Sequence, residues 1–309
     1  MRPILHVGFG KTSTSYLQEI FFPEILKSSN RLYWKEDEKL SKQVLLHRDK
    51  MIYNDDFHKV ILPENIFISL ETLMGPSGWD PEYYEKFAEL NLKAFGSNCE
   101  ILFTIREPYG WLSSNYSRNI GKLNIIPESK FYVSNQNYKH YKLRDKHCLT
   151  FALQKFSYKK VFEIYSKRFS KVTILKYENL KDLNIWEKVL NSQLNLSEDS
   201  VLIKDKILNR GLSKSSIRLT IKTDNFLKLF GLGIEKLHRF NKFLRFKNNS
   251  NIIKKYFNIF LNLCTWKKLL NFLDRKIFKY EKYELTTNKF IRDQIDRLNK
   301  EYKEIKEIF

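Results

Sequence analysis

A run of small and hydroxyl-bearing residues follows the first apolar segment of the chain. Residues 4–9 have the pattern of a short strand, and a helical pattern begins soon afterwards. The residues at this turn are Gly10, Lys11, Thr12, Ser13, Thr14 and Ser15. Backbone N–H groups at a helix start, an ammonium group and several hydroxyl groups are suited to bind phosphate. The spacing therefore predicts a phosphate-binding loop; an ordinary helix cap with a solvated lysine is the alternative interpretation.

The length of this loop restricts the ligand. The sequence Gly-Lys-Thr also occurs in the loops of nucleoside triphosphatases, but that motif needs a glycine five positions before Gly10, where this chain has Leu5. The loop is too short for a triphosphate. Its length instead suits a single 5′-phosphate with a further group attached.

A second pair of phosphate-binding side chains follows another apolar segment. Residues 100–106 predict a strand that ends at Arg106, and Pro108 begins a helical pattern that carries Ser114. A guanidinium fork and a hydroxyl group that converge on one point form a good phosphate site. Two such sites at neighbouring strand ends predict a nucleotide that carries both a 5′- and a 3′-phosphate.

Alternating strand and helix patterns place these residues. Besides the two strands above, the pattern predicts strands at residues 65–71 and 171–180, and helices at 11–22, 80–95 and 158–169. Pro81 is expected at the first position of its helix, and Pro23 is expected to end the first helix. This order predicts a three-layer α/β fold, with helices on both faces of a central parallel sheet. Ligands bind at the carboxyl ends of such strands.

Two segments carry a resemblance to a known family. HVGFGKTSTSYLQ resembles the 5′-phosphosulfate loop of sulfotransferases that use 3′-phosphoadenosine 5′-phosphosulfate, in particular the bacterial carbohydrate-type members. TIREPYGWLSSNY resembles their 3′-phosphate motif, while VTILKYENL, NRGLSKSSIRL and IDRLNKEY are weaker matches. The resemblance covers residues 3–218 and the last 20 or so. Gly10 stands where the family usually has proline, and Ser13 where it has glycine, so Ser13 is expected to crowd the nucleotide if that position needs a positive φ.

The resemblance implies a P-loop-like sulfotransferase fold, a sulfated nucleotide as donor and no metal. Lys11 would be catalytic, in contact with the bridging oxygen and the sulfuryl group, while Arg106 and Ser114 would bind the 3′-phosphate. Arg210 and Gly211 would close over the same phosphate. The other cofactor-binding residues would be those of the loop, Gly10, Thr12, Ser13, Thr14 and Ser15. The acceptor would be a hydroxyl group of a glycan or glycoconjugate.

The general base is expected to be Glu71, which ends the strand at residues 65–71, where related carbohydrate sulfotransferases have a glutamate base. A surface pairing between Glu71 and a lysine is the alternative. His6 is a rival base, although a histidine inside a strand is more often structural. Glu178, after the last predicted strand, is expected to have a structural role.

The chain is strongly basic, with 55 Lys and Arg against 35 Asp and Glu in 309 residues, a net charge of +20. Residues 1–100 carry 12 basic and 15 acidic side chains, residues 101–200 carry 17 and 9, and residues 201–309 carry 26 and 11. This gradient favours an anionic partner, although compositional drift in a lysine-rich proteome would also produce it. No nucleic-acid-binding motif accompanies the charge, so nucleic acid is not expected.

Cysteine usage and the absence of long apolar runs favour a cytoplasmic protein. Cys99, Cys148 and Cys264 lie far apart, without the spacing of a thiolate metal site or a disulfide framework. The chain shows no signal-peptide pattern and no apolar run of membrane-spanning length.

Residues 219–280 are expected to form a basic, aromatic, helical insert within a single domain of residues 1–309. Three interpretations stay open: a core-facing apolar stripe that includes Phe257 and Phe260, a surface helix at the inner face of the membrane, and a groove for an anionic glycan. For the whole chain, the alternatives to a sulfotransferase are a nucleotide-dependent kinase and a nucleotide-binding or membrane-surface protein without catalysis.

Overall fold

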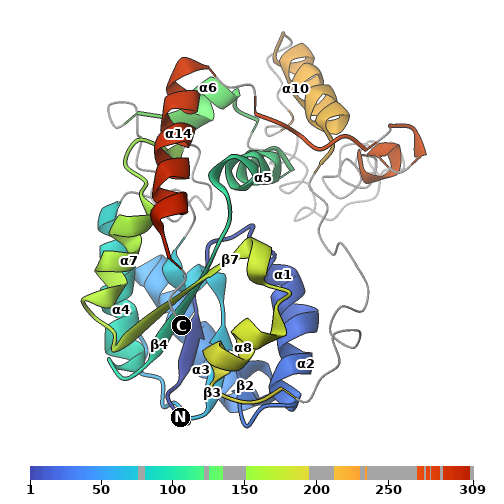
Figure 1. Cartoon of the computed structure of the whole chain (residues 1–309). Coiled ribbons are helices and arrows are strands. Elements are labelled where there is room, and N and C mark those ends of the chain that lie inside the picture. The colour runs from blue at the N-terminus through green and yellow to red at the C-terminus, as the bar shows by residue number, and fades with distance from the viewer. Residues whose placement is uncertain are drawn as a thin grey trace, which may run out of the picture. The chain divides into compact units, whose positions relative to one another are not determined.

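The computed structural model describes residues 1–75, 81–121, 125–134, 151–194, 212–229, 234, 270–274, 276–278, 280–285 and 288–306 (Figure 1). The chain divides into two compact units. The first comprises Met1–Trp111, Tyr132–Asn209 and Thr287–Phe309, and the second comprises Leu112–Phe131 and Arg210–Thr286. The single domain expected at residues 1–309 stays a prediction.

A five-stranded sheet forms the centre of the first unit. Its strands lie in the order β2 (Leu32–Tyr33), β3 (Ile66–Ser69), β1 (Ile4–His6), β4 (Glu100–Ile105) and β7 (Lys171–Lys176), and every neighbouring pair is parallel. A separate parallel pair joins β5 (Tyr132–Val133) to β6 (Phe151–Ala152). The predicted α/β fold with a central parallel sheet is confirmed.

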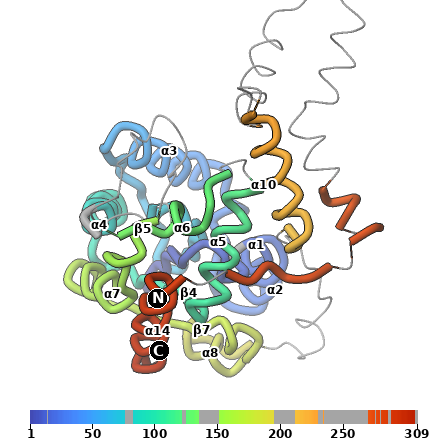
Figure 2. Tube along the Cα trace, turned by 90° about the horizontal axis from the view of Figure 1, so that it is seen from above, coloured from blue at the N-terminus to red at the C-terminus, as the bar shows by residue number. Residues whose placement is uncertain are grey.

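Helices cover both faces of this sheet, as Figure 2 shows from above. One face carries α1 (Thr14–Tyr16), α2 (Phe22–Lys27) and α8 (Leu183–Leu190); the other carries α3 (Glu38–Asn54), α4 (Pro81–Phe95) and α7 (Tyr158–Ser166). On the first face, the ring of Phe22 packs against Phe67 of β3, with the ring centroids 4.7 Å apart. On the other, Phe103 of β4 packs against Phe162 and Tyr165, both at 5.1 Å. Helix α14 (Lys289–Glu304) lies beside α7.

Pro23 does not end the first helix, contrary to the sequence prediction. A π-helix at Leu17–Phe21 joins α1 to α2, and the Phe22 N–H donates to the carbonyl of Leu17, five residues back. Pro23 then lies in the first turn of α2, where a missing N–H group costs little. The helical path therefore continues to Lys27.

All four predicted strands end earlier than expected: those predicted at residues 4–9 and 100–106 end at His6 and Ile105. The other two are each followed by a 3₁₀ turn at the carboxyl edge of the sheet. The strand predicted at residues 65–71 ends at Ser69, and Glu71–Met74 form the turn. The strand predicted at residues 171–180 ends at Lys176, followed by a turn at Tyr177–Asn179. Glu71 and Glu178 therefore lie in tight turns directly after their strands.

The second unit contains most of α5 (Pro108–Gly121), α6 (Glu128–Phe131) and α10 (Lys214–Leu229). The Asp274 carboxylate accepts hydrogen bonds from the Ser213 N–H and the Ser216 hydroxyl, at 3.0 and 2.5 Å, and so fixes the start of α10. Among the described residues of the predicted insert, residues 219–229, 234, 270–274 and 276 are helical, whereas 277, 278 and 280 are not. Phe257, Phe260 and Cys264 lie outside the described residues. Within the described part of the chain, no helix has the length and apolar character needed to cross a membrane.

Candidate functional site

Three of the predicted site residues follow three adjacent strands of the first unit. The candidate loop, residues 7–13, connects β1 to α1; Glu71 begins the turn after β3; Arg106 follows β4. Because β3, β1 and β4 are parallel neighbours, all three lie at the carboxyl edge of one sheet. Of the other predicted residues, Ser114 lies on α5 in the second unit. Arg210, Gly211 and the side chain of Thr14 lie outside the described part of the structure.

The loop backbone alternates in handedness. Lys11 has φ = 76° and Ser13 has φ = 61°, whereas Thr12 between them is not in the positive-φ region. Backbone concavities that bind anions in proteins are built from N–H groups of residues that alternate between right- and left-handed conformations. Residues 11–13 are therefore the candidate for contact with a 5′-phosphate. The position at which the resemblance has glycine does need a positive φ, and Ser13 occupies it at a cost of about 1–2 kcal/mol.

Gly8 allows the loop to lie directly against β4. A Cβ atom at Gly8 would be 2.4 Å from the Thr104 hydroxyl oxygen and 3.0 Å from the Thr104 backbone nitrogen. Real Cβ atoms do not approach so closely, so a larger residue would displace the loop from the sheet. Nearby, the indole N–H of Trp111 donates to the carbonyl of Gly10 at 2.8 Å and holds the other side of the turn.

A chain of neutral buried groups connects the three strand ends. His6 Nδ1 lies 2.7 Å from the Ser69 hydroxyl, His6 Nε2 lies 3.1 Å from the Thr104 hydroxyl, and the Thr104 hydroxyl lies 2.7 Å from that of Thr12. Thr12 donates its proton to the carbonyl of Phe9 at 2.6 Å. Since each hydroxyl group has one proton, Thr104 must donate to Thr12, His6 Nε2–H to Thr104, and Ser69 to His6 Nδ1. The chain thus has one direction, from β3 through β1 and β4 into the loop.

This arrangement assigns His6 a structural role. His6 is fully buried, and burial lowers its pKa to about 3, so the ring is neutral at physiological pH with both nitrogens engaged. Thr12 is also fully buried, and its hydroxyl group stabilises the loop from inside. Contact between Thr12 and a 5′-phosphate stays a prediction.

The Arg106 side chain lies across the end of the neighbouring strand β7. Its guanidinium carbon is 4.9 Å from the ring centroid of Tyr177, and its Nε is 3.9 Å from a carboxylate oxygen of Glu107. The guanidinium makes no hydrogen bond to another described residue, although the side chain is only 18% exposed. Its backbone is fixed, because the Tyr158 hydroxyl donates to the Arg106 carbonyl at 3.0 Å. A partly exposed guanidinium group whose N–H donors make no hydrogen bond to the described residues is suited to bind an anion.

Residues that the sequence did not single out complete this junction. Glu107 caps α5 by accepting a hydrogen bond from the Gly110 N–H at 2.9 Å, and a Cβ atom at Gly110 would lie 1.9 Å from that carboxylate. The ring of Tyr177 packs against the guanidinium group of Arg106.

Glu178, by contrast, was expected from the sequence to have a structural role. It is exposed and accepts a hydrogen bond from the Tyr302 hydroxyl, which agrees with that role.

Comparisons with known proteins give little further help. The sequence matches no known family profile, and a search of curated proteins found no match. Among solved structures, the chain is similar to a sulfotransferase from Alicyclobacillus acidocaldarius, with 12% sequence identity, a TM-score of 0.41, and coverage of 71% of this chain and 90% of that one. A likeness at this level does not establish a family, so the function has to be inferred from the site itself.

Proposed function

We propose that the chain is a sulfotransferase that moves a sulfuryl group from 3′-phosphoadenosine 5′-phosphosulfate to a hydroxyl group of a glycan or glycoconjugate. The observation that carries this proposal is the position of three groups at one edge of the sheet. They are the anion-binding loop with Lys11 after β1, the carboxylate of Glu71 after β3, and the guanidinium of Arg106 after β4.

The donor nucleotide fits the cationic groups of this edge. The alternating backbone at residues 11–13 suits a single 5′-phosphate, and Lys11 lies at its first position. The available N–H groups of Arg106 suit a second phosphate, because a guanidinium fork binds phosphate in a bidentate manner. When bound, the nucleotide would supply an activated sulfuryl group and a phosphate leaving group.

The reaction needs positioning and charge stabilisation more than covalent chemistry by the protein. Glu71 would accept the proton of the acceptor hydroxyl while the acceptor oxygen bonds to sulfur and the bond from sulfur to the bridging phosphate oxygen breaks. Lys11 would stabilise the charge that develops on the bridging oxygen and the sulfuryl group. The buried chain from Ser69 to Thr12 keeps the loop in place during this step.

An anionic acceptor is favoured by the basic residues of the C-terminal third. In the described residues, helix α10 contributes Lys214, Arg218, Lys222 and Lys228. Lys214 and Lys228 are paired with Glu281 and Asp224, whereas Arg218 and Lys222 are exposed. We place the reaction in the cytoplasm, with Arg218 and Lys222 as candidates for peripheral contact with an anionic membrane surface.

Calorimetric titration with adenosine 3′,5′-bisphosphate tests the proposal, with ATP and magnesium as the comparison. We expect micromolar binding of the bisphosphate that weakens at least about 100-fold when Lys11→Ala and Arg106→Ala are combined. The control combines Lys86→Ala and Arg168→Ala, which remove the same charge from ion pairs with Asp55 and with Glu85 and Glu89. Preference for magnesium ATP would favour a kinase, and intact bisphosphate binding in the site variant would contradict the proposed site.

A further inference from the structure

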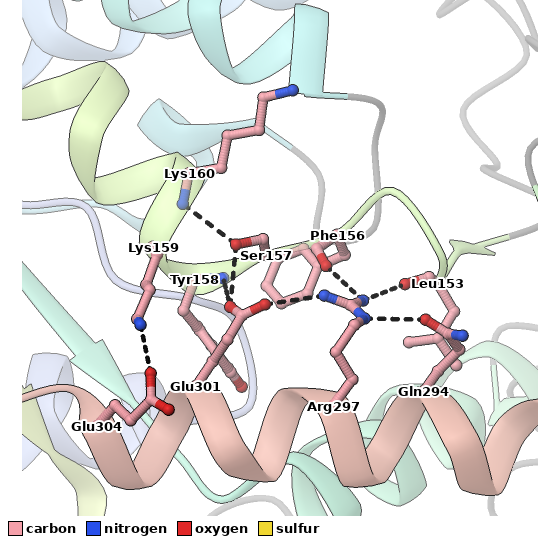
Figure 3. A network of polar contacts seen from close by, with 10 residues as sticks. All are labelled: Leu153, Phe156, Ser157, Tyr158, Lys159, Lys160, Gln294, Arg297, Glu301 and Glu304. Carbon is pink, nitrogen blue, oxygen red and sulfur yellow. Dashed lines mark hydrogen bonds and ion pairs between the residues drawn. The ribbon is translucent and has the colours of Figure 1, made fainter.

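Helix α14 is attached to the chain segment before α7 by a polar network (Figure 3). One guanidinium nitrogen of Arg297 donates hydrogen bonds to two backbone carbonyl groups, those of Leu153 at 3.1 Å and Phe156 at 2.8 Å. Its other nitrogens donate to Gln294 at 3.0 Å and Glu301 at 2.8 Å. One side chain of the C-terminal helix thus fixes the backbone of a segment about 140 residues earlier in the chain.

Glu301 fixes the next two residues of the same segment. One of its carboxylate oxygens accepts hydrogen bonds from the Ser157 hydroxyl at 2.9 Å and the Tyr158 N–H at 3.0 Å. Tyr158 is the first residue of α7, so this N–H group has no acceptor within its own helix. The negative charge also lies at the positive end of the helix dipole. Glu301 therefore fixes both the start of α7 and the backbone of Tyr158.

The segment that α14 fixes carries the aromatic side chains beneath the candidate site. Phe156 and Tyr158 are fully buried, and their ring centroids lie 5.6 and 5.4 Å from that of Phe9 in the loop. The ring of Phe156 also packs at 4.9 Å against Trp111, which holds the Gly10 carbonyl. The Tyr158 hydroxyl donates to the carbonyl of Arg106. The loop proposed to bind the 5′-phosphate and the arginine proposed to bind the 3′-phosphate therefore both depend on the position of this segment.

We infer that Glu301 and Arg297 are positioning residues for the nucleotide site, and that they act on Arg106 through Tyr158. The inference rests on the proposed function for the identity of the ligand. The network orients Arg106 by its backbone, while the guanidinium group itself stays available for an anion. A displaced Tyr158 would leave the arginine charge in place but change its direction, which a bidentate phosphate contact does not tolerate.

The same helix pair offers a matched control. Lys159 of α7 pairs with Glu304 of α14 at 2.5 Å, but the two side chains are 47% and 45% exposed. Glu301 is 16% exposed and contacts the segment directly. Exposed pairs contribute little to stability, so the loss of Glu304 should not move Tyr158.

The test compares two ligands, adenosine 3′,5′-bisphosphate and adenosine 5′-monophosphate, because the ratio of their affinities isolates the 3′-phosphate contact. Tyr158→Phe keeps the buried ring and removes only the donor to Arg106. We expect it to reduce this ratio about fivefold to tenfold while the affinity for the monophosphate stays within about twofold. Tyr165→Phe, on the same helix with its ring against Phe103 and Phe169, should leave both affinities unchanged.

Glu301→Gln should reduce the same ratio by about threefold or more, whereas Glu304→Gln should not change it. In an Arg106→Ala background, Tyr158→Phe should have no further effect on the ratio, because the two residues act on one contact. A lower melting temperature with an unchanged ratio in both Tyr158→Phe and Glu301→Gln would overturn the inference and leave α14 a purely structural element. A wild-type protein that does not prefer the bisphosphate would instead overturn the proposed function, and the inference with it.

Discussion

At the amino edge of the central sheet, the charged residues Arg31 and Glu100 are buried, each with 6% exposure, whereas at the carboxyl edge Lys11, Glu71 and Arg106 are only partly buried. The buried polar groups of the carboxyl edge are neutral instead, as in His6 and its hydroxyl partners. The amino edge thus contains buried charged side chains, whereas the buried polar side chains of the carboxyl edge are neutral and hydrogen-bonded to one another. The difference separates charges that stabilise the fold from charges that a ligand can reach.

The charged side chains of the amino edge form hydrogen bonds with other groups of the protein. Arg31 donates to the carbonyl groups of Leu190 at 3.1 Å and Arg2 at 2.9 Å, and Glu100 accepts from the Thr173 hydroxyl at 2.6 Å. Burial lowers the pKa of Arg31, while the nearby Glu100 raises it. Arg31 and Glu100 line a cavity of about 770 Å³, but their polar atoms already have partners inside the protein. Volume and cationic lining alone therefore do not make this cavity a ligand site.

The largest predicted effect tests the amino edge. Arg31→Ala should lower the free energy of unfolding by about 3 kcal/mol, because the buried carbonyl of Leu190 and the part-buried carbonyl of Arg2 lose their donor and Glu100 loses a nearby cation. Urea denaturation measures this change. Lys171→Ala, which removes an ion pair to Glu100 from a side chain that is 36% exposed, should cost less than about 1 kcal/mol. If the two variants lose the same free energy of unfolding, the burial of Arg31 does not make it more important for stability than Lys171.

At the carboxyl edge, we expect a substitution of arginine to reduce ligand affinity and to leave the stability of the fold nearly unchanged. Arg106→Lys keeps the charge but loses the fork, so affinity for adenosine 3′,5′-bisphosphate should fall about 30-fold, or about 2 kcal/mol, while stability changes by less than about 0.5 kcal/mol. Arg168→Lys is the control, because Arg168 is also 18% exposed but pairs with Glu85 and Glu89. A stability loss in Arg106→Lys as large as that in Arg31→Ala would remove the contrast between the two edges.

The neutral chain at the carboxyl edge predicts a pH dependence of stability. The folded-state pKa of His6 is about 3, against 6.5 when unfolded, so below pH 6.5 the unfolded state takes up a proton that the folded state does not. The contribution of His6 is complete above pH 6.5 and decreases as the pH falls toward 3. Between pH 7.5 and 5.5 the loss should be about 1.4 kcal/mol.

His6→Gln isolates this effect. The variant should be less stable than wild type at pH 7.5, because the chain of hydrogen bonds is interrupted, but its stability should fall less between pH 7.5 and 5.5, by the same 1.4 kcal/mol or so. Burial also lowers the pKa of His47, but this contribution is present in both proteins and cancels in the difference. Parallel pH profiles for the two proteins would show that His6 is not the buried neutral group described here.

The sequence predicted the positions of the site better than the contacts that hold it. Strand patterns placed Lys11, Glu71 and Arg106 at strand ends, because apolar runs and their terminating turns are local signals. The polar residues inside those runs, His6, Ser69 and Thr104, were the available signal for the buried chain. Their pairing depends on the order of the strands, which no local pattern contains.

Contacts between distant segments were likewise not predictable. No sequence pattern connects Glu301 with Tyr158, 143 residues earlier, because neither residue stands out from its neighbours in its own helical pattern. The Pro23 prediction was wrong for a local reason: the π-helix at Leu17–Phe21 leads directly into α2, and Pro23 lies in the first turn of α2, where proline is tolerated. Strand β2 and helix α3 were missed, although Asp37, which accepts from the Leu40 N–H at 2.9 Å, is a recognisable helix cap.

The smallest predicted effect tests the strain in the loop itself. Ser13 has φ = 61°, a region that costs an L-residue about 1–2 kcal/mol, whereas glycine adopts it freely. Ser13→Gly should therefore stabilise the protein by about 0.5 kcal/mol, after the greater flexibility of glycine in the unfolded chain is subtracted. Ser15→Gly, two residues later in α1, should have the opposite sign, because glycine is unfavourable within a helix. Denaturation curves of the two variants measure this difference, and destabilisation by both would mean that Ser13 makes contacts worth more than its backbone strain.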